Sequence, residues 1–250
     1  MAPKNKILVI NQEIDNLQLN DVLHRIISAI KNNQQLKIAT VNPEFMVLSM
    51  KDDNFAKTLE NFDIKVPDGV GITLLPKIFK GEVFTQRITG VDLSWKLFEM
   101  ANKNHYKVLM LGSTNKNSSA ACTRLRRIFP TLNIKCISGG KIDPFNPTEK
   151  LIEDISDFKP NILLVGLGSP KQEYFISSNE KLLKYNVAVG VGGTTDFIAE
   201  TTKRAPNALR QIGLEWLWRL MFEPRRFKRI FNATIVFPYL YIKSLIKKRT

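Results

Sequence analysis

The stretch Asn161-Ile-Leu-Leu-Val-Gly-Leu167-Gly-Ser-Pro-Lys-Gln-Glu173 joins an uninterrupted apolar run to a turn and a polar segment. A strand that is apolar on both faces is typical of the centre of a parallel sheet covered by helices on both sides. Gly168-Ser169-Pro170 predicts a tight connection into a helix, because proline is favoured at the first helical position. This stretch therefore predicts an α/β fold.

The same alternation continues on both sides of that stretch. Short β-branched runs are separated by segments with helical periodicity, and in Asp21–Lys31 the apolar residues share one face, with Asn20 as the expected N-cap. The order predicts a Rossmann-like, largely parallel sheet flanked by helices. The predicted strands are Lys6–Ile10, Leu36–Val41, Ile64–Val66, Lys107–Leu111, Asn133–Ile137, Asn161–Leu167 and Asn186–Val191.

The positive charge is concentrated in the C-terminal part of the chain. The 250 residues contain 37 Lys and Arg against 23 Asp and Glu, a net charge of +14, and residues 203–250 contain 12 of the basic residues but only two acidic ones. Such an excess favours an anionic partner, which could be nucleic acid, phospholipid or a phosphorylated substrate. Because the composition also shifts near Ala205–Pro206, we predict a catalytic domain over residues 1–205 and a basic C-terminal helical appendage over residues 206–250.

Several classes of protein are disfavoured by what the chain lacks. Cys122 and Cys136 do not have Cys-x-x-Cys spacing, and two scattered histidines are too few for a zinc site, so a reducing cytoplasm is expected. We expect no signal peptide, since no apolar run follows the N-terminal lysines. The apolar run Ala233–Ile242 is too short for a transmembrane span, and we expect Pro238 to interrupt it.

Polar residues and glycines follow at least four of the predicted strands, at the edge where open parallel sheets bind ligands. Each group also fits an ordinary connection: Pro67-Asp68-Gly69 is a common turn sequence, and the glycine-rich segments could be tight turns. The Gly-x-Gly-x-x-Gly and Gly-Lys-Ser/Thr fingerprints are both absent. The candidate substrate-binding residues are Thr40, Asn42, Gly69, Gly168, Lys171, Gln172, Glu173, Gly192 and Gly193.

No Asp-x-Asp pair, the usual carboxylate pair for a metal ion on a sugar nucleotide, occurs in the sequence. An anionic leaving group would then need cations or helix ends for its stabilisation. Arg87 lies just before a predicted helix and suits that role, although it could equally be a surface arginine on a loop.

Taken together, the strand-end motifs resemble the WecG/TagA/CpsF family of bacterial glycosyltransferases over roughly residues 40–229. The motifs occur in this order: Thr40-Val-Asn42-Pro-Glu44, Pro67-Asp68-Gly69-Val-Gly71, Arg87-Ile-Thr-Gly90-Val-Asp92, Gly166-Leu-Gly168-Ser-Pro170-Lys171-Gln172-Glu173, Gly190-Val-Gly192-Gly193, Lys203-Arg-Ala-Pro206, Leu214-Glu-Trp-Leu-Trp-Arg219 and Glu223-Pro-Arg225-Arg226.

The resemblance implies an inverting, metal-independent transferase that needs no cofactor. It implies transfer of an N-acetylhexosamine-type sugar, such as N-acetylmannosamine, from UDP to polyprenyl-diphosphate-linked GlcNAc at the cytoplasmic face of the membrane, for teichoic acid, capsule or a related surface glycan. Asp68 becomes the candidate general base, with Arg87 as the second catalytic residue. The residues implied to face the membrane and the acceptor diphosphate are Arg219, Arg225, Arg226 and Arg229.

One segment departs from the family pattern. Thr195 stands where the family has an aromatic residue, and Glu200 stands where it has a glycine. A glycine lost from a turn can change the backbone there, so the identity of the donor sugar stays open.

The appendage has the composition of a helix that lies on a membrane. Phe227, Ile230, Phe231 and Thr234 fall on one predicted helical face among basic residues, which favours an anionic lipid surface. The candidate interfacial anchors are Trp216, Trp218, Tyr239 and Tyr241.

Other interpretations of the chain stay open. The appendage could instead be a packed C-terminal helix, and its apolar surface also leaves a homo-oligomer open. A nucleic-acid-binding protein would use the same basic and aromatic residues, but it would leave the strand-end polar groups unexplained. A nucleotide-dependent oxidoreductase is disfavoured because the dinucleotide fingerprint is absent.

Overall fold

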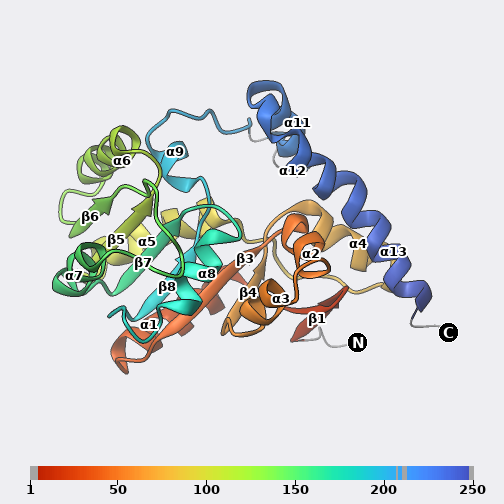
Figure 1. Cartoon of the computed structure of the whole chain (residues 1–250), viewed down its shortest axis with the longest axis horizontal. Helices are drawn as coiled ribbons and strands as arrows, with labels where there is room; N and C mark the ends of the chain where they lie inside the picture. The colour runs from red at the N-terminus through yellow and green to blue at the C-terminus, as the bar shows by residue number, and fades with distance from the viewer. Residues whose placement is uncertain (1–4, 207, 210–212, 248–250) are drawn as a thin grey trace.

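A computed structural model describes residues 5–206, 208–209 and 213–247 (Figure 1). Its centre is a six-stranded sheet with the order β4-β3-β8-β7-β5-β6, in which every neighbouring pair is parallel. This confirms the predicted fold class, and each strand of the sheet lies within one residue of its predicted bounds. The strands are β3 (Leu36–Val41), β4 (Ile64–Pro67), β5 (Val108–Gly112), β6 (Ile134–Ile137), β7 (Ile162–Gly166) and β8 (Val187–Gly190).

Helices cover both faces of the sheet, and successive strand residues point into two separate cores. In β7, Leu163 and Val165 join one core, whereas Ile162 and Leu164 join the other, as the pleat of a strand requires. The second core is closed by α1 (Leu19–Lys31), α5 (Gly90–Asn104), α6 (Asn115–Ile128) and α9 (Thr194–Ile198). The first is closed by α2 (Pro43–Ser49), α3 (Asp53–Glu60), α4 (Val70–Lys80), α7 (Glu149–Phe158) and α8 (Lys171–Ser178).

At the N-terminus one local prediction is wrong and one strand was not predicted. Helix α1 begins at Leu19 with Gln18 as its N-cap, because the side chain of Asp21 accepts the Gln18 N–H at 3.1 Å, so Asn20 is a helical residue and not the cap. The first strand, β1 (Lys6–Val9), pairs antiparallel with β2 (Gln12–Asp15), which the sequence analysis missed. The residues of β2 contain only one apolar side chain, Ile14, so no apolar run marked this strand.

The appendage forms a helical arm that runs beside α2 and α4 at one end of the molecule (Figure 1). It consists of α11 (Glu215–Phe222), a 3-10 turn (Pro224–Arg226), α12 (Phe227–Phe231), a π-helical turn (Asn232–Val236) and α13 (Phe237–Lys247). We expected Pro238 to interrupt the helix, but the arm continues through it. The wider π-helical turn directly before it accommodates a residue that has no N–H to donate.

The arm has an inner and an outer face that differ from the predicted ones. Ile230 is buried, whereas Phe227 and Phe231 are exposed, so these three residues do not share one face. Phe237 and Tyr241 are fully buried in the first core, which rules out Tyr241 as an interfacial anchor. Three basic residues counted in the appendage, Arg210, Lys248 and Arg249, lie outside the described residues.

Within the described ranges, no helix combines the length and apolarity that crossing a bilayer requires.

Candidate active site

Asp68 lies directly beyond the carboxyl end of β4, where the loop is held by hydrogen bonds on both sides. Its backbone N–H donates to the carbonyl oxygen of Val41 at 2.7 Å. Its Oδ2 atom accepts the N–H of Gly90, the first residue of α5, at 3.1 Å. These contacts fix the carboxyl group between the ends of β3 and α5.

The protein shifts the pKa of Asp68 toward neutrality. Burial, with a smaller contribution from the nearby Glu215 carboxylate, raises this pKa to about 6, although the Gly90 N–H, Arg219 and Arg87 oppose the rise. A carboxylate with such a pKa is ionised at neutral pH and is still basic enough to take a proton from a reacting hydroxyl group. The position and the pKa of Asp68 both suit a general base.

Glycine is required immediately after Asp68. Gly69 has a φ of +105°, and a Cβ atom at this position would lie 3.0 Å from the Cδ atom of Pro43. Asn42, just before that proline, caps α2 by accepting the N–H groups of Glu44 at 2.9 Å and Phe45 at 3.3 Å. The loops after β3 and β4 therefore pack against each other beside Asp68.

Thr40 ties the end of β3 to the next strand of the sheet. Its buried hydroxyl group donates to the carbonyl oxygen of Gly190 at 2.8 Å. Arg87, which is half-buried, precedes Thr89, the N-cap of α5, by two residues, and Ile88 donates its N–H to Pro67 at 2.9 Å. The structure thus brings Thr40, Asn42, Asp68, Gly69 and Arg87 together at one edge of the sheet.

The loop after β7 is linked to the loop after β8 by a buried relay. Gln172 accepts the N–H of Gly192 at 2.9 Å and donates its amide to Glu173 at 2.6 Å. The Glu173 residue is 0% exposed, so it has no surface to offer a substrate and instead holds Gln172 in place. Gly168, with a φ of +77°, and the exposed Lys171 lie on the outer side of the same loop, where their predicted substrate contacts stay predictions.

The exchange Glu173→Gln tests this buried carboxyl through stability. Burial raises the pKa of Glu173 to about 7, so the folded state binds its proton more tightly than the unfolded state and loses stability as the pH rises from about 4.5 through 7. Between pH 4.5 and pH 8, the free energy of unfolding of the variant should therefore rise by on the order of 2 kcal/mol relative to that of the wild type. Urea denaturation at the two pH values measures this gain, with Glu153→Gln, an exchange at an exposed position, as the control. If the free energies of unfolding of variant and wild type differ by the same amount at both pH values, the raised pKa of Glu173 is contradicted.

A second polar cluster at the same edge was missed by the sequence analysis. The Oδ1 atom of Asp196 accepts hydrogen bonds from the hydroxyl group of Ser113 and from Asn117, the latter at 2.8 Å. Ser113 directly follows β5, so the rule that marked the other strand ends could have found it. Together with Gly192 and Gly193, these residues line the edge on the side away from Asp68.

The backbone at Glu200 has the conformation expected of the glycine that the resemblance implies at this position. Glu200 has a φ of +57°, which belongs to the left-handed region that glycine adopts most easily. Its carboxylate pairs with Arg124 at 2.7 Å, and Arg124 also donates to the carbonyl oxygen of Ile198 at 3.0 Å. Thr195 is buried. A residue in the left-handed conformation therefore stands where the resemblance implies a glycine.

The arginines of the appendage have different surroundings. Arg219 pairs with Glu215 at 3.1 Å and lies over the ring of Phe197, with 4.8 Å between its guanidinium carbon and the ring centroid. Arg226 pairs with Glu223, and a Cβ atom added to Gly193 would lie 3.9 Å from both the Nη2 atom of Arg226 and the Oδ2 atom of Asp196. Arg225 is exposed. Arg219 and Arg226 thus lie over the strand-end edge.

Arg229 makes a bidentate ion pair with Glu44, which the sequence analysis did not assign to the site. The Nε atom of Arg229 lies 3.0 Å from both carboxylate oxygens, and its Nη2 atom lies 2.6 Å from Oε2. Glu44 follows Asn42 by two residues, in the first turn of α2. This pair joins the appendage directly to the loop that carries the candidate site.

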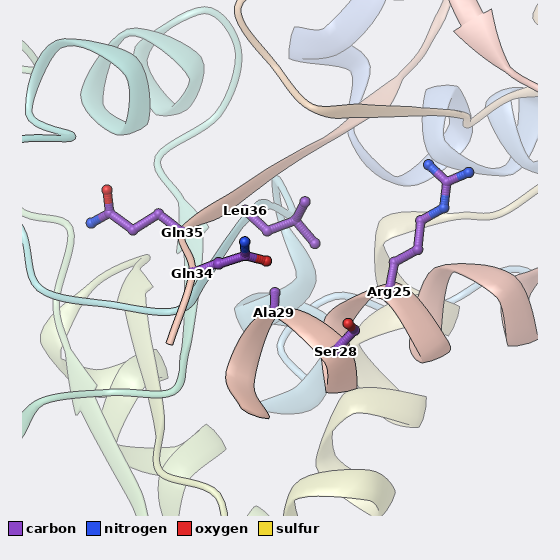
Figure 2. A pocket seen from close by; sticks show the side chains of 6 residues that line it. All are labelled: Arg25, Ser28, Ala29, Gln34, Gln35 and Leu36. Carbon is purple, nitrogen blue, oxygen red and sulfur yellow. The ribbon is translucent and has the colours of Figure 1, made fainter. Parts of the chain in front are cut away.

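An open hollow elsewhere on the molecule does not belong to this site. It lies between the end of α1 and the start of β3 and is lined by Arg25, Ser28, Ala29, Gln34, Gln35 and Leu36 (Figure 2). Leu36 begins β3, whereas Thr40 and Asn42 lie at the opposite end of that strand. The hollow is therefore at the wrong edge of the sheet for the strand-end residues.

Comparison with known proteins identifies the family to which this chain belongs. Residues 7–250 match the model of the glycosyl transferase WecG/TagA/CpsF family. A similar protein from Bacillus spizizenii is 29% identical over 230 residues, which cover 92% of this chain and 86% of that protein. One from Staphylococcus aureus (strain MRSA252) is 29% identical over 241 residues, covering 96% and 93%. Both are named N-acetylglucosaminyldiphosphoundecaprenol N-acetyl-beta-D-mannosaminyltransferase. This chain belongs to the WecG/TagA/CpsF family and is a glycosyltransferase.

Proposed function

We propose that this enzyme transfers N-acetylmannosamine from UDP to GlcNAc on a polyprenyl diphosphate, with inversion at the anomeric carbon and without a metal ion or a cofactor. The proposal rests on the Asp68 carboxyl group, which accepts the Gly90 N–H and whose pKa is raised by burial. This group lies at the edge of the sheet where arginines of the appendage converge. The names of the similar proteins support the sugar and the acceptor.

In the proposed reaction Asp68 removes the proton of the acceptor hydroxyl group. The hydroxyl oxygen forms a bond to the anomeric carbon of the donor sugar while the bond from that carbon to the diphosphate breaks on the opposite face. This single displacement inverts the configuration, and it needs one base on the acceptor side. Asp68 can be that base because only one of its oxygens is needed to accept the Gly90 N–H.

Positive groups would stabilise the departing UDP. Arg87 lies beside the base, Arg226 lies over the Gly192-Gly193 turn, and oriented positive groups lower the energy of a transition state in which negative charge develops. Among the described residues, no three His, Cys, Asp or Glu side chains gather in a way that could hold a metal ion. On the proposed mechanism, Arg87 and Arg226 take the role that a divalent ion has in other transferases.

We place the reaction at the cytoplasmic face of a membrane, where the appendage would contact anionic lipid. Its basic residues Arg225, Lys228 and Lys243 are exposed, and Phe227, Phe231 and Tyr239 are exposed beside them. Basic and apolar side chains in such a mixture favour an anionic lipid surface. A nucleic-acid-binding role would leave the Asp68 loop and the Gln172 relay without a purpose.

A panel of UDP-sugars tests the proposed function. Purified enzyme is incubated with each donor and with a water-soluble, short-chain polyprenyl-diphosphate-GlcNAc analogue, with and without EDTA. UDP-N-acetylmannosamine should give the fastest release of UDP, the product should have the inverted configuration, and EDTA should change the rate by less than about twofold. A rate that EDTA abolishes and manganese restores would contradict the metal-independent mechanism, and no turnover with any UDP-sugar would contradict the donor.

A further inference from the structure

Helix α4, which belongs to the catalytic domain, is apolar on the side that faces away from the protein. The helix begins directly after Asp68-Gly69, and Ile72 and Pro76 are buried on its inner side. Leu74 and Ile78 lie one helical turn apart on the opposite side, where they are 43% and 60% exposed. Apart from Lys77 and Lys80, the exposed residues of this helix are apolar, and such a helix face is typical of a surface that contacts a partner.

Helix α13 has the same character. Phe237 and Tyr241 are buried on its inner side. Tyr239, Ile242 and Ile246 are exposed on the other side, where Tyr239 is 62% exposed. The spacing of these three residues places them along one face of the helix. The outer face of α13 is therefore apolar along most of its length.

The two helices pack against each other, so that their exposed apolar residues belong to one region of the surface. A Cβ atom added to Gly71 would lie 3.2 Å from the ring of Phe237. Phe79, itself 46% exposed, has its ring centroid 6.1 Å from that of Tyr241. Figure 1 shows α4 and α13 at the same end of the molecule. We call the outer sides of α4 and α13 the lipid face.

The charges of the lipid face decide which partner fits it. Neither α4 nor α13 contains an acidic residue, and Lys77 and Lys243 are exposed on these helices. A second copy of the chain would place the same positive charges against each other, which disfavours a self-association surface. An anionic bilayer offers both apolar contact and opposite charge.

We infer that α4 is a second membrane-contacting element, so that the catalytic domain itself lies on anionic lipid together with α13. Since α4 begins two residues after Asp68, this orientation holds the proposed base close to the bilayer surface, where the sugar of a lipid-linked acceptor emerges. The inference rests on the proposed function only in taking the acceptor to be lipid-linked.

The double substitution Leu74→Gln/Ile78→Gln tests the inference. Co-sedimentation uses vesicles of equal parts phosphatidylglycerol and phosphatidylcholine, and vesicles of phosphatidylcholine alone. The variant should bind the anionic vesicles about tenfold more weakly than the wild type, and Ile78→Gln alone should show a smaller loss. Leu182→Gln is the matched control, because Leu182 is 55% exposed and lies outside the lipid face. Turnover of the water-soluble acceptor should stay within about twofold of wild type, since neither side chain belongs to the site.

Wild-type affinity of both α4 variants for the anionic vesicles would overturn the inference. So would sedimentation equilibrium in which the variants lose self-association while they keep vesicle binding, because the face would then be an interface between copies. If the wild type fails to use the water-soluble acceptor, the proposed function fails, and the vesicle experiment still decides the role of α4.

Discussion

Replacement of Asp68 by asparagine should lower the turnover number about thousandfold and leave the affinity for UDP within about twofold of wild type. An asparagine side chain has nearly the same shape and can still accept the Gly90 N–H through its oxygen, so the loop that joins β4 to α4 should keep its conformation. It cannot take up the proton of the acceptor hydroxyl group. Initial rates with saturating donor and the water-soluble acceptor, together with calorimetric titration of UDP, separate the loss of chemistry from the loss of binding.

The pH dependence of the wild type provides an independent check on the same residue. Because burial raises the pKa of Asp68 to about 6 and the ionised form is the base, the rate should rise about tenfold per pH unit below 6 and level off above it. The residual rate of Asp68→Asn should lack this rise. A variant that retains more than about a tenth of the wild-type turnover would remove Asp68 from the role of base, as would an unchanged pH profile.

The sheet could be predicted from the sequence because its strands are local apolar runs. A strand such as Ile162–Gly166 is buried on both faces, so nearly all its residues are apolar and the run can be recognised in the sequence. Strand β2 could not be found in this way, because one apolar residue among polar ones carries no such signal. The strand-end rule located Asp68 and Gln172, and the same rule extended to Ser113 would have located the Asp196 cluster.

What the sequence could not supply are the contacts between distant segments. The family resemblance implies that Arg229 faces the membrane and the acceptor diphosphate, but it does not reveal the carboxylate partner of Arg229, Glu44, which lies 185 residues earlier. Tyr241 was predicted to be an anchor because aromatic residues favour interfaces, but the fold buries it beside Phe237 and α4. Periodicity gives the faces of a helix, and only the tertiary structure decides which of two apolar faces turns inward.

The ion pair between Glu44 and Arg229 leads to the second large expected effect. Arg229→Glu should lower turnover roughly thirtyfold, because it replaces a bidentate attraction with repulsion, each on the order of 1 kcal/mol at this half-exposed site. Glu44→Arg should have a similar effect for the same reason. The double variant Glu44→Arg/Arg229→Glu restores opposite charges and should recover most of the activity, if the pair holds the appendage over the site. Initial rates with the water-soluble acceptor keep membrane binding out of the measurement.

The same three variants distinguish this docking role from direct binding of the acceptor diphosphate by Arg229. A glutamate at position 229 cannot bind a diphosphate whatever stands at position 44, so the double variant would stay inactive if direct binding were the role. Lys228→Glu is the matched control, because Lys228 is exposed, adjacent and of the same charge, and it should keep nearly wild-type turnover. Protease cleavage between the domain and α12 should become faster in the two single variants and return to the wild-type rate in the double variant, because a docked arm protects the chain that leads to it. If turnover and protease resistance both recover in the double variant, the role of Arg229 is to dock the appendage. If neither recovers, Arg229 is assigned to binding of the acceptor diphosphate.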